Sequence, residues 1–132
     1  MVILVRSMDL RKIYDTIMNM DKRIRFVGVL NKNARLVEGG MRENIPSLLD
    51  PDKNDLFYLR VLSHLKELKD FENVLGAVNY IHVQMDKVSF VIMRLRQEEG
   101  EGGGNGLMLL VSMEPDMNPS FIVPSIRNVL LE

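Results

Sequence analysis

The sequence contains no cysteine and only two histidines among its 132 residues. Without cysteine, the chain has no disulfide, no thiolate metal ligand and no cysteine nucleophile. His64 falls in a predicted helix and His82 in a predicted strand, so the two do not form a local metal-binding pair. We interpret both as packed or surface residues, and we expect neither a metal nor a cofactor.

Long apolar runs are also missing. No stretch approaches the ~18 apolar residues of a membrane-spanning helix. The apolar segment 1–5 is short, Arg6 follows it, and no small-residue cleavage site appears, so the start does not fit a signal peptide. We expect residues 1–7 to form an N-terminal strand or a tail, no membrane span, and a cytoplasmic protein.

The motifs of common catalytic sites are absent or incomplete. No Gly-x-Ser-x-Gly elbow of a serine hydrolase occurs. The glycine cluster that starts at Gly100 lacks the sixth-position glycine of a dinucleotide-binding loop, and it precedes a predicted strand where a phosphate loop precedes a helix. We interpret residues 97–106 as a flexible hairpin loop. We expect no enzymatic activity. The alternative is an enzyme with a pair of carboxylates that the fold brings together, which spacing along the sequence does not reveal.

An acidic segment at residues 50–55 resembles the start of a calcium-binding loop, with oxygen ligands at its first, third and fifth positions. Such a loop needs glycine at its sixth position and glutamate at its twelfth, where this sequence has Asp55 and Val61. Acidic residues also favour the positive end of a helix dipole. We therefore interpret the segment as a helix start.

The composition is that of one soluble globular domain, 1–132, with 46% apolar and 27% charged residues. Charge is unevenly placed, because residues 1–42 have a net charge of +5 and the remainder −6. Two regions that pack against each other would explain this. Nucleic-acid binding is an alternative that the scattered positions do not favour. It would use these basic residues: Arg6, Arg11, Lys12, Lys22, Arg23 and Arg25.

Apolar periodicity predicts three helices and five strands. The helices cover residues 10–18, residues 52–55 to 68–71, and a C-terminal segment that ends at Leu131 and whose start Pro124 obscures. The predicted strands are 24–30, 35–38, 77–83, 88–96 and 107–113. Gly39 and Gly40 are expected to end the second strand. The order α-ββ-α-βββ-α predicts an α/β (α+β) domain with a central, mostly antiparallel five-stranded sheet.

This order of elements is that of roadblock/dynein-light-chain-type domains, which are related to the profilin-like and longin folds. The segment 24–30, followed by a polar turn and 36–40, resembles the first hairpin of that class. The chain also resembles small archaeal proteins of uncharacterised function in the segments 26–29, 36–41, 75–80, 86–88 and 109–115. The likeness covers residues 8–132, and the 97–106 loop is longer than the pattern needs.

The resemblance implies a non-catalytic regulatory or scaffold module that forms a homodimer or a paralogous heterodimer. Such domains pair through the second helix and third strand, and they bind small GTPases or scaffold proteins. The wide apolar arc of the predicted second helix fits that arrangement. The predicted interface residues are Tyr58, Leu62, Leu65, Val78, Tyr80 and His82.

The alternative function is a small-molecule sensor. A five-stranded sheet with helices is also the architecture of PAS-like domains, which hold ligands between sheet and helix. Gly39, Gly40, Met41 and Arg42 are the candidate rim of such a pocket, with Arg42 as an anion contact. A turn with a solvated arginine is the competing interpretation of the same four residues.

Overall fold

The computed structural model describes residues 3–5, 9–97 and 106–130. Its elements are β1 (Ile3–Val5), α1 (Leu10–Met18), β2 (Ile24–Leu30), β3 (Leu36–Met41), α2 (Pro51–Lys69), α3 (Glu72–Leu75), β4 (Ile81–Gln84), β5 (Ser89–Gln97), β6 (Leu107–Met113) and α4 (Pro119–Leu130). The α+β class is confirmed, with one helix, α3, more than the sequence predicted. The predicted loop 97–106 and the helix end at Leu131 lie largely outside the described residues.

The five predicted strands form an antiparallel sheet, and β1 joins it as a parallel strand. The strand order is β1-β5-β6-β2-β3, and β4 also pairs with β5. β4 pairs with the first half of β5, from Ile81 opposite Ile92 to Gln84 opposite Ser89. β1 pairs with its last three residues, Leu95 to Gln97. The two short strands therefore share one edge of β5.

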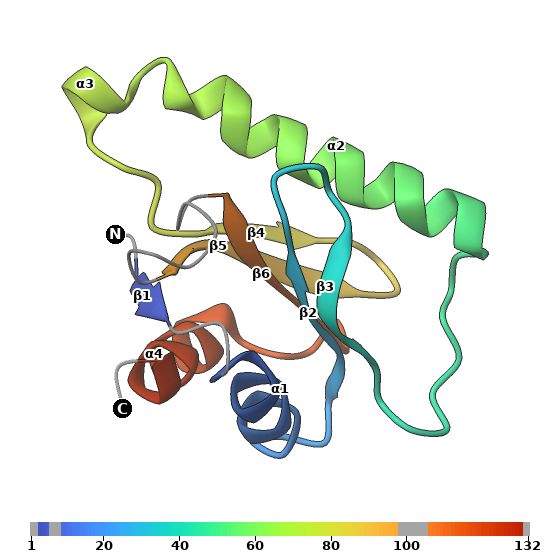
Figure 1. The fold of residues 1–132 in the computed structure, drawn as a ribbon. Helices are drawn as coiled ribbons and strands as arrows, with labels where there is room; N and C mark the ends of the chain where they lie inside the picture. The colour runs from blue at the N-terminus through green and yellow to red at the C-terminus, as the bar shows by residue number, and fades with distance from the viewer. Residues whose placement is uncertain (1–2, 6–8, 98–105, 131–132) are drawn as a thin grey trace.

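Helices cover both faces of the sheet, as Figure 1 shows. α1 and α4 lie on one face, where they pack around Val91 and Met93 of β5. α2 lies on the other face, over Phe90 and Ile92. Neighbouring residues of a strand point to opposite faces of the sheet. Helices cover both faces, and this explains the continuous apolar runs of β2, β5 and β6.

The glycine pair 39–40 does not end β3, so that prediction was wrong. β3 continues to Met41, with Gly39 opposite Gly28 and Gly40 opposite Val27 of β2. Gly39 has φ +115°, and a Cβ there would overlap the carbonyl oxygen of Val27. Glycine therefore lets the strand continue in close contact with β2, because it has no side chain to collide.

Three further details were not predicted from the sequence. β4 begins at Ile81 rather than Ala77, because α3 follows α2 and residues 76–80 return the chain to the sheet. α4 continues through Pro124, and its start at Pro119 follows Asn118, whose Oδ1 accepts from the Ser120 amide at 2.9 Å. In the β2–β3 turn, Ala34 has a positive φ of 62°.

The two glycines of β3 give a matched pair of substitutions. We expect Gly39→Ala to lower the free energy of unfolding by about 3 kcal/mol, because the new methyl group meets the β2 backbone in a disfavoured conformation. Gly40→Ala should change it by less than about 0.5 kcal/mol, because nothing lies within 4 Å of a Cβ there. Urea unfolding of the two variants measures the difference, and equal losses would contradict this account of Gly39.

Candidate functional site

The long helix α2 starts where the acidic segment predicted. Asp50 caps it, since its side-chain oxygen accepts from the Lys53 amide at 2.9 Å, and Pro51 occupies the first helical position. The acidic segment 50–55 therefore forms a helix start, as the sequence predicted. Among the described residues, no three His, Cys, Asp or Glu side chains are grouped so that they could hold a metal. No helix in the described ranges is long and apolar enough to cross a membrane.

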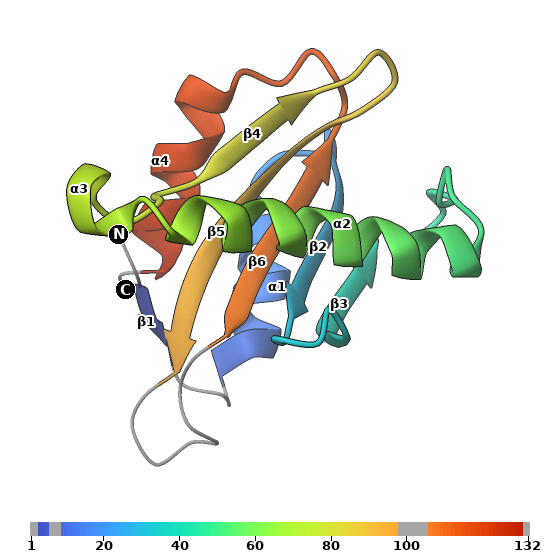
Figure 2. The ribbon, with the colours of Figure 1, turned by 90° about the horizontal axis from the view of Figure 1, so that it is seen from above.

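The C-terminal end of α2 and all of α3 project past the sheet on the side of β4 (Figures 1 and 2). This projection carries Leu68, Phe71, Val74 and Leu75, all exposed, with Val74 and Leu75 at 87% and 80%. We call these four residues the apolar overhang. An ion pair between Glu72 of α3 and Arg94 of β5 holds it to the domain.

The outer edge of β4, next to the overhang, pairs with no other strand in the described part of the chain. The Met85 amide donates to the Val88 carbonyl at 2.9 Å, and Gln84 lies opposite Ser89. Hydrogen-bonded pairs alternate along an antiparallel ladder, so the backbone groups of Ile81 and Val83 face β5. Those of His82 and Gln84 point outward, which leaves them open to a further strand.

The predicted interface residues are divided between the core and the surface. Leu62 and Leu65 are buried against the sheet, and Tyr58 and Val78 are half-buried beside the same core. Leu62 and Leu65 therefore hold α2 on its own sheet, so a charge at either would act first on folding. Their place in an interface stays a prediction.

The other two predicted interface residues, Tyr80 and His82, lie at the β4 edge. Tyr80 is exposed, and its ring lies 5.7 Å from the guanidinium carbon of Arg127 of α4. The predicted interface did not include the overhang, although Leu68, Phe71 and Leu75 continue the helical spacing of Leu62 and Leu65. That spacing indicates a shared helix face but does not indicate that the face is exposed.

The predicted rim residues lie in β3 and just after it. Gly39 and Gly40 are strand residues, and Met41 lines a cavity described below. The Arg42 guanidinium is held by the backbone, since Nε donates to the Ile24 carbonyl at 2.7 Å. Its Nη2 donates to the carbonyls of Met18 at 2.6 Å and Asp21 at 2.8 Å. Arg42 thus joins the end of α1 to β2 and β3. Its role as an anion contact stays a prediction.

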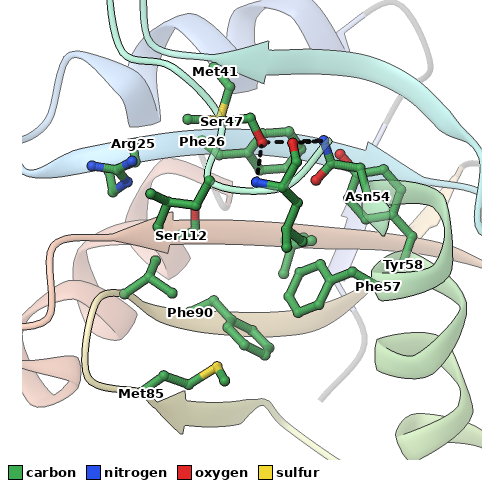
Figure 3. A pocket seen from close by; sticks show the side chains of 14 residues that line it. Arg25, Phe26, Met41, Ser47, Asn54, Phe57, Tyr58, Met85, Phe90 and Ser112 are labelled. Carbon is green, nitrogen blue, oxygen red and sulfur yellow. Dashed lines mark hydrogen bonds between the residues drawn. The ribbon is translucent and has the colours of Figure 1, made fainter. Parts of the chain in front are cut away.

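A cavity of about 240 Å³ lies beneath the N-terminal half of α2 (Figure 3). Its floor is the sheet, and its walls are α2, the β3–α2 connection and the β4–β5 turn. It is lined by Arg25, Phe26, Met41, Ser47, Leu48, Leu49, Asn54, Phe57, Tyr58, Met85, Val88, Phe90, Leu110 and Ser112. Four of the chain's eight aromatic residues are among them.

Burial in this region raises the pKa of the Tyr58 phenol, and the nearby Asp55 carboxylate raises it further. A second cavity of about 210 Å³ continues beneath α2 toward β4. The two share Phe57, Met85 and Phe90. α2 therefore covers its face of the sheet incompletely along much of its length.

Several of the basic residues in the first third of the chain are paired with carboxylates. Arg25 contacts Glu114 at 3.0 Å, Arg23 contacts Asp21 at 2.9 Å, and Arg11 contacts Glu38 at 3.3 Å. Hydrogen bonds from Arg23 lower the pKa of Asp21 to about 2. Arg6 lies outside the described residues. The Arg25–Glu114 pair joins the basic first third of the chain to the acidic remainder. Contact between these two regions is one of the explanations given above for the uneven charge.

The chain is similar to known proteins in structure rather than in sequence. Its sequence matches no family model and no curated protein. The gliding protein MglB from Thermus thermophilus aligns with a TM-score of 0.65 at 10% identity, over 90% of this chain and 81% of that one. An MglB with a tetrameric arrangement aligns with a TM-score of 0.64 at 14% identity, over 92% and 81%.

A Roadblock/LC7 domain from Streptomyces avermitilis aligns with a TM-score of 0.56 at 15% identity, over 94% of this chain and 99% of that one. Identities this low establish a shared fold and nothing about function. The chain has the fold of Roadblock/LC7 domains, and the fold implied by the sequence resemblance is thereby confirmed.

The hydrogen bonds of Arg42 predict a structural role for this residue. Arg42→Met should lower the free energy of unfolding by about 2–4 kcal/mol, because three carbonyl groups lose a charged donor. Arg35→Met is the matched control, since Arg35 is exposed and its loss should cost less than about 0.5 kcal/mol. Urea unfolding compares the two. An Arg42→Met variant as stable as the control would rule out the structural role.

Proposed function

We propose that this protein is a non-catalytic interaction module that works as a homodimer, formed through the outer edge of β4 and the apolar overhang. The observation that carries the proposal is the position of the overhang. Its four apolar side chains lie exposed beside an open strand edge. Contiguous exposed apolar surface of this kind marks a docking site, and an open edge supplies the backbone groups for it.

A second copy of the chain fits this surface by symmetry. Two β4 edges related by a two-fold axis run antiparallel, so each satisfies the outward amide and carbonyl groups of the other. The same axis carries each overhang across the joined edge and onto the partner's sheet. There it would meet the second cavity, whose lining includes Val61 of α2 and Ile81 and Val83 of β4. Apolar surface thus meets apolar surface on both copies.

The structural comparisons support the proposal in one respect. One similar protein, MglB, is described with a tetrameric arrangement, so a chain of this fold can assemble with further copies. A paralogous heterodimer, a small GTPase or scaffold partner, a cytoplasmic location and the likeness to archaeal proteins remain predictions from the sequence.

The first test places a charge on the overhang. Leu75→Asp should weaken self-association at least about tenfold, because a carboxylate would have to be buried in the interface. Leu75 is 80% exposed in the single chain, so its folding should be unaffected. Sedimentation equilibrium measures the association, and circular dichroism measures the folding.

Phe121→Asp is the matched control for this test. Phe121 is also exposed, at 54%, but lies on α4 on the opposite face of the sheet. The proposal predicts that this variant associates as the parent chain does. It fails if the parent chain is monomeric at high concentration, or if both variants dissociate equally.

The second test removes one outward backbone donor of β4. His82→Pro deletes an N–H that faces the open edge, whereas His82→Ala keeps the donor and removes the same side chain. We expect the proline variant to associate at least about tenfold more weakly than the alanine variant. The comparison is made by sedimentation at several concentrations. Equal association of the two would show that β4 does not pair across the dimer.

A further inference from the structure

We propose that the cavity beneath the N-terminal half of α2 binds a small aromatic carboxylate of one or two rings. The ring system would lie among the aromatic side chains, with the carboxylate at the end formed by Arg25. This inference is independent of the dimer proposed above. The sequence analysis named a small-molecule sensor as the alternative function, and this cavity is a specific site for it. The cavity lining includes Met41, one of the predicted rim residues.

The size of the cavity limits the ligand. An apolar protein cavity of about 150 Å³ accommodates benzene, and pockets for drug-sized molecules begin near about 300 Å³. At about 240 Å³ the cavity lies between these values. A ligand of one or two rings fits that volume, whereas a nucleotide exceeds it.

The lining favours an aromatic ligand over an aliphatic one. Phe57 and Phe90 meet edge to face, with ring centroids 5.1 Å apart. Phe26 and Tyr58 lie 6.1 Å apart on another wall, tilted by 30°. These rings come from α2, β2 and β5 and surround the same space in Figure 3. A planar ligand gains stacked and edge-to-face contacts with them that an alkyl chain cannot make.

The charge of Arg25 favours an acid over a neutral ligand. Its side chain is only 14% exposed, and a guanidinium remains charged at every accessible pH. Nη1 donates to Glu114 at 3.0 Å and Nη2 reaches the Pro46 carbonyl at 3.4 Å, so two of its five N–H groups are engaged by these contacts. Ser112 adds a hydroxyl to the cavity lining. A ligand carboxylate would accept from the remaining donors.

The outer wall of the cavity is already in place. Ser47 Oγ accepts from the Leu49 amide and from Asn54 Nδ2, each at 3.2 Å. These bonds fasten the β3–α2 connection to the first turn of α2. A ligand therefore has little of the wall to order when it binds, which lowers the entropic cost of binding.

Isothermal titration of the full chain with three probes tests the ligand class. The probes are 2-naphthoate, 2-naphthalenemethanol and decanoate. We expect 2-naphthoate to bind once per chain and at least about tenfold more tightly than either of the others. No binding of any probe at millimolar concentration would overturn the proposal, and so would tighter binding of decanoate.

Two substitutions with matched controls test the location. Ser112→Leu fills the floor of the cavity and should abolish 2-naphthoate binding, whereas Ser120→Leu on exposed α4 surface should not. Arg25→Gln should reduce 2-naphthoate affinity about tenfold and leave that of 2-naphthalenemethanol unchanged. Circular dichroism checks folding, and Val88→Phe fills the cavity from another wall if Ser112→Leu does not fold. If a folded variant with a filled cavity bound 2-naphthoate as tightly as the parent chain, the proposed site would be wrong.

The dimer and the ligand site can fail separately. Leu75 lies outside the cavity lining, so Leu75→Asp should bind 2-naphthoate with the affinity of the parent chain. If Leu75→Asp no longer dimerises but still binds 2-naphthoate, the result supports the ligand site independently of the dimer. Loss of binding in this folded variant would show that the cavity is not complete within one chain, which contradicts the proposal.

Discussion

The structure depends on one constraint, which is that a sheet apolar on both faces must be covered on both. α1 and α4 cover one face together, with Val91 and Met93 at their interface with the sheet. Among the described helices, α2 is the one that covers the other face, and it crosses the strands rather than following them (Figure 2). A single crossing helix touches the sheet along one line and leaves space on either side. The two cavities and the overhang are the consequences of that geometry.

The sequence predicted the elements whose signals are local. Residues 10–18, 24–30 and 107–113 form the predicted helix and strands, because their periodicity reports which face is buried. Gly39 and Gly40 were misplaced because their role is set by contact with Val27 on another strand. The hydrogen bonds of Arg42 could not be predicted for the same reason, since its acceptors lie at residues 18 to 24.

The candidate sites were predictable only in part. The wide apolar arc of α2 indicated that this helix serves more than its own sheet, and the overhang fits that indication. Which residues are left exposed, however, depends on where the sheet ends beneath the helix, and no local pattern contains that information. From the sequence, the buried Leu62 and Leu65 were therefore chosen as interface residues, whereas the exposed Phe71 and Leu75 were not. The four aromatic side chains of the cavity come from three separate elements, so spacing along the chain does not reveal it.

Hydrogen exchange of the β4 amides, followed by NMR at several protein concentrations, tests the central claim most directly. In a single chain, the outward amides of His82 and Gln84 face solvent, whereas those of Ile81 and Val83 are bonded to β5. If a second copy pairs with this edge, His82 and Gln84 become protected at high concentration and exchange quickly on dilution. Fast exchange of both at every concentration, with Ile81 and Val83 protected, would contradict the account.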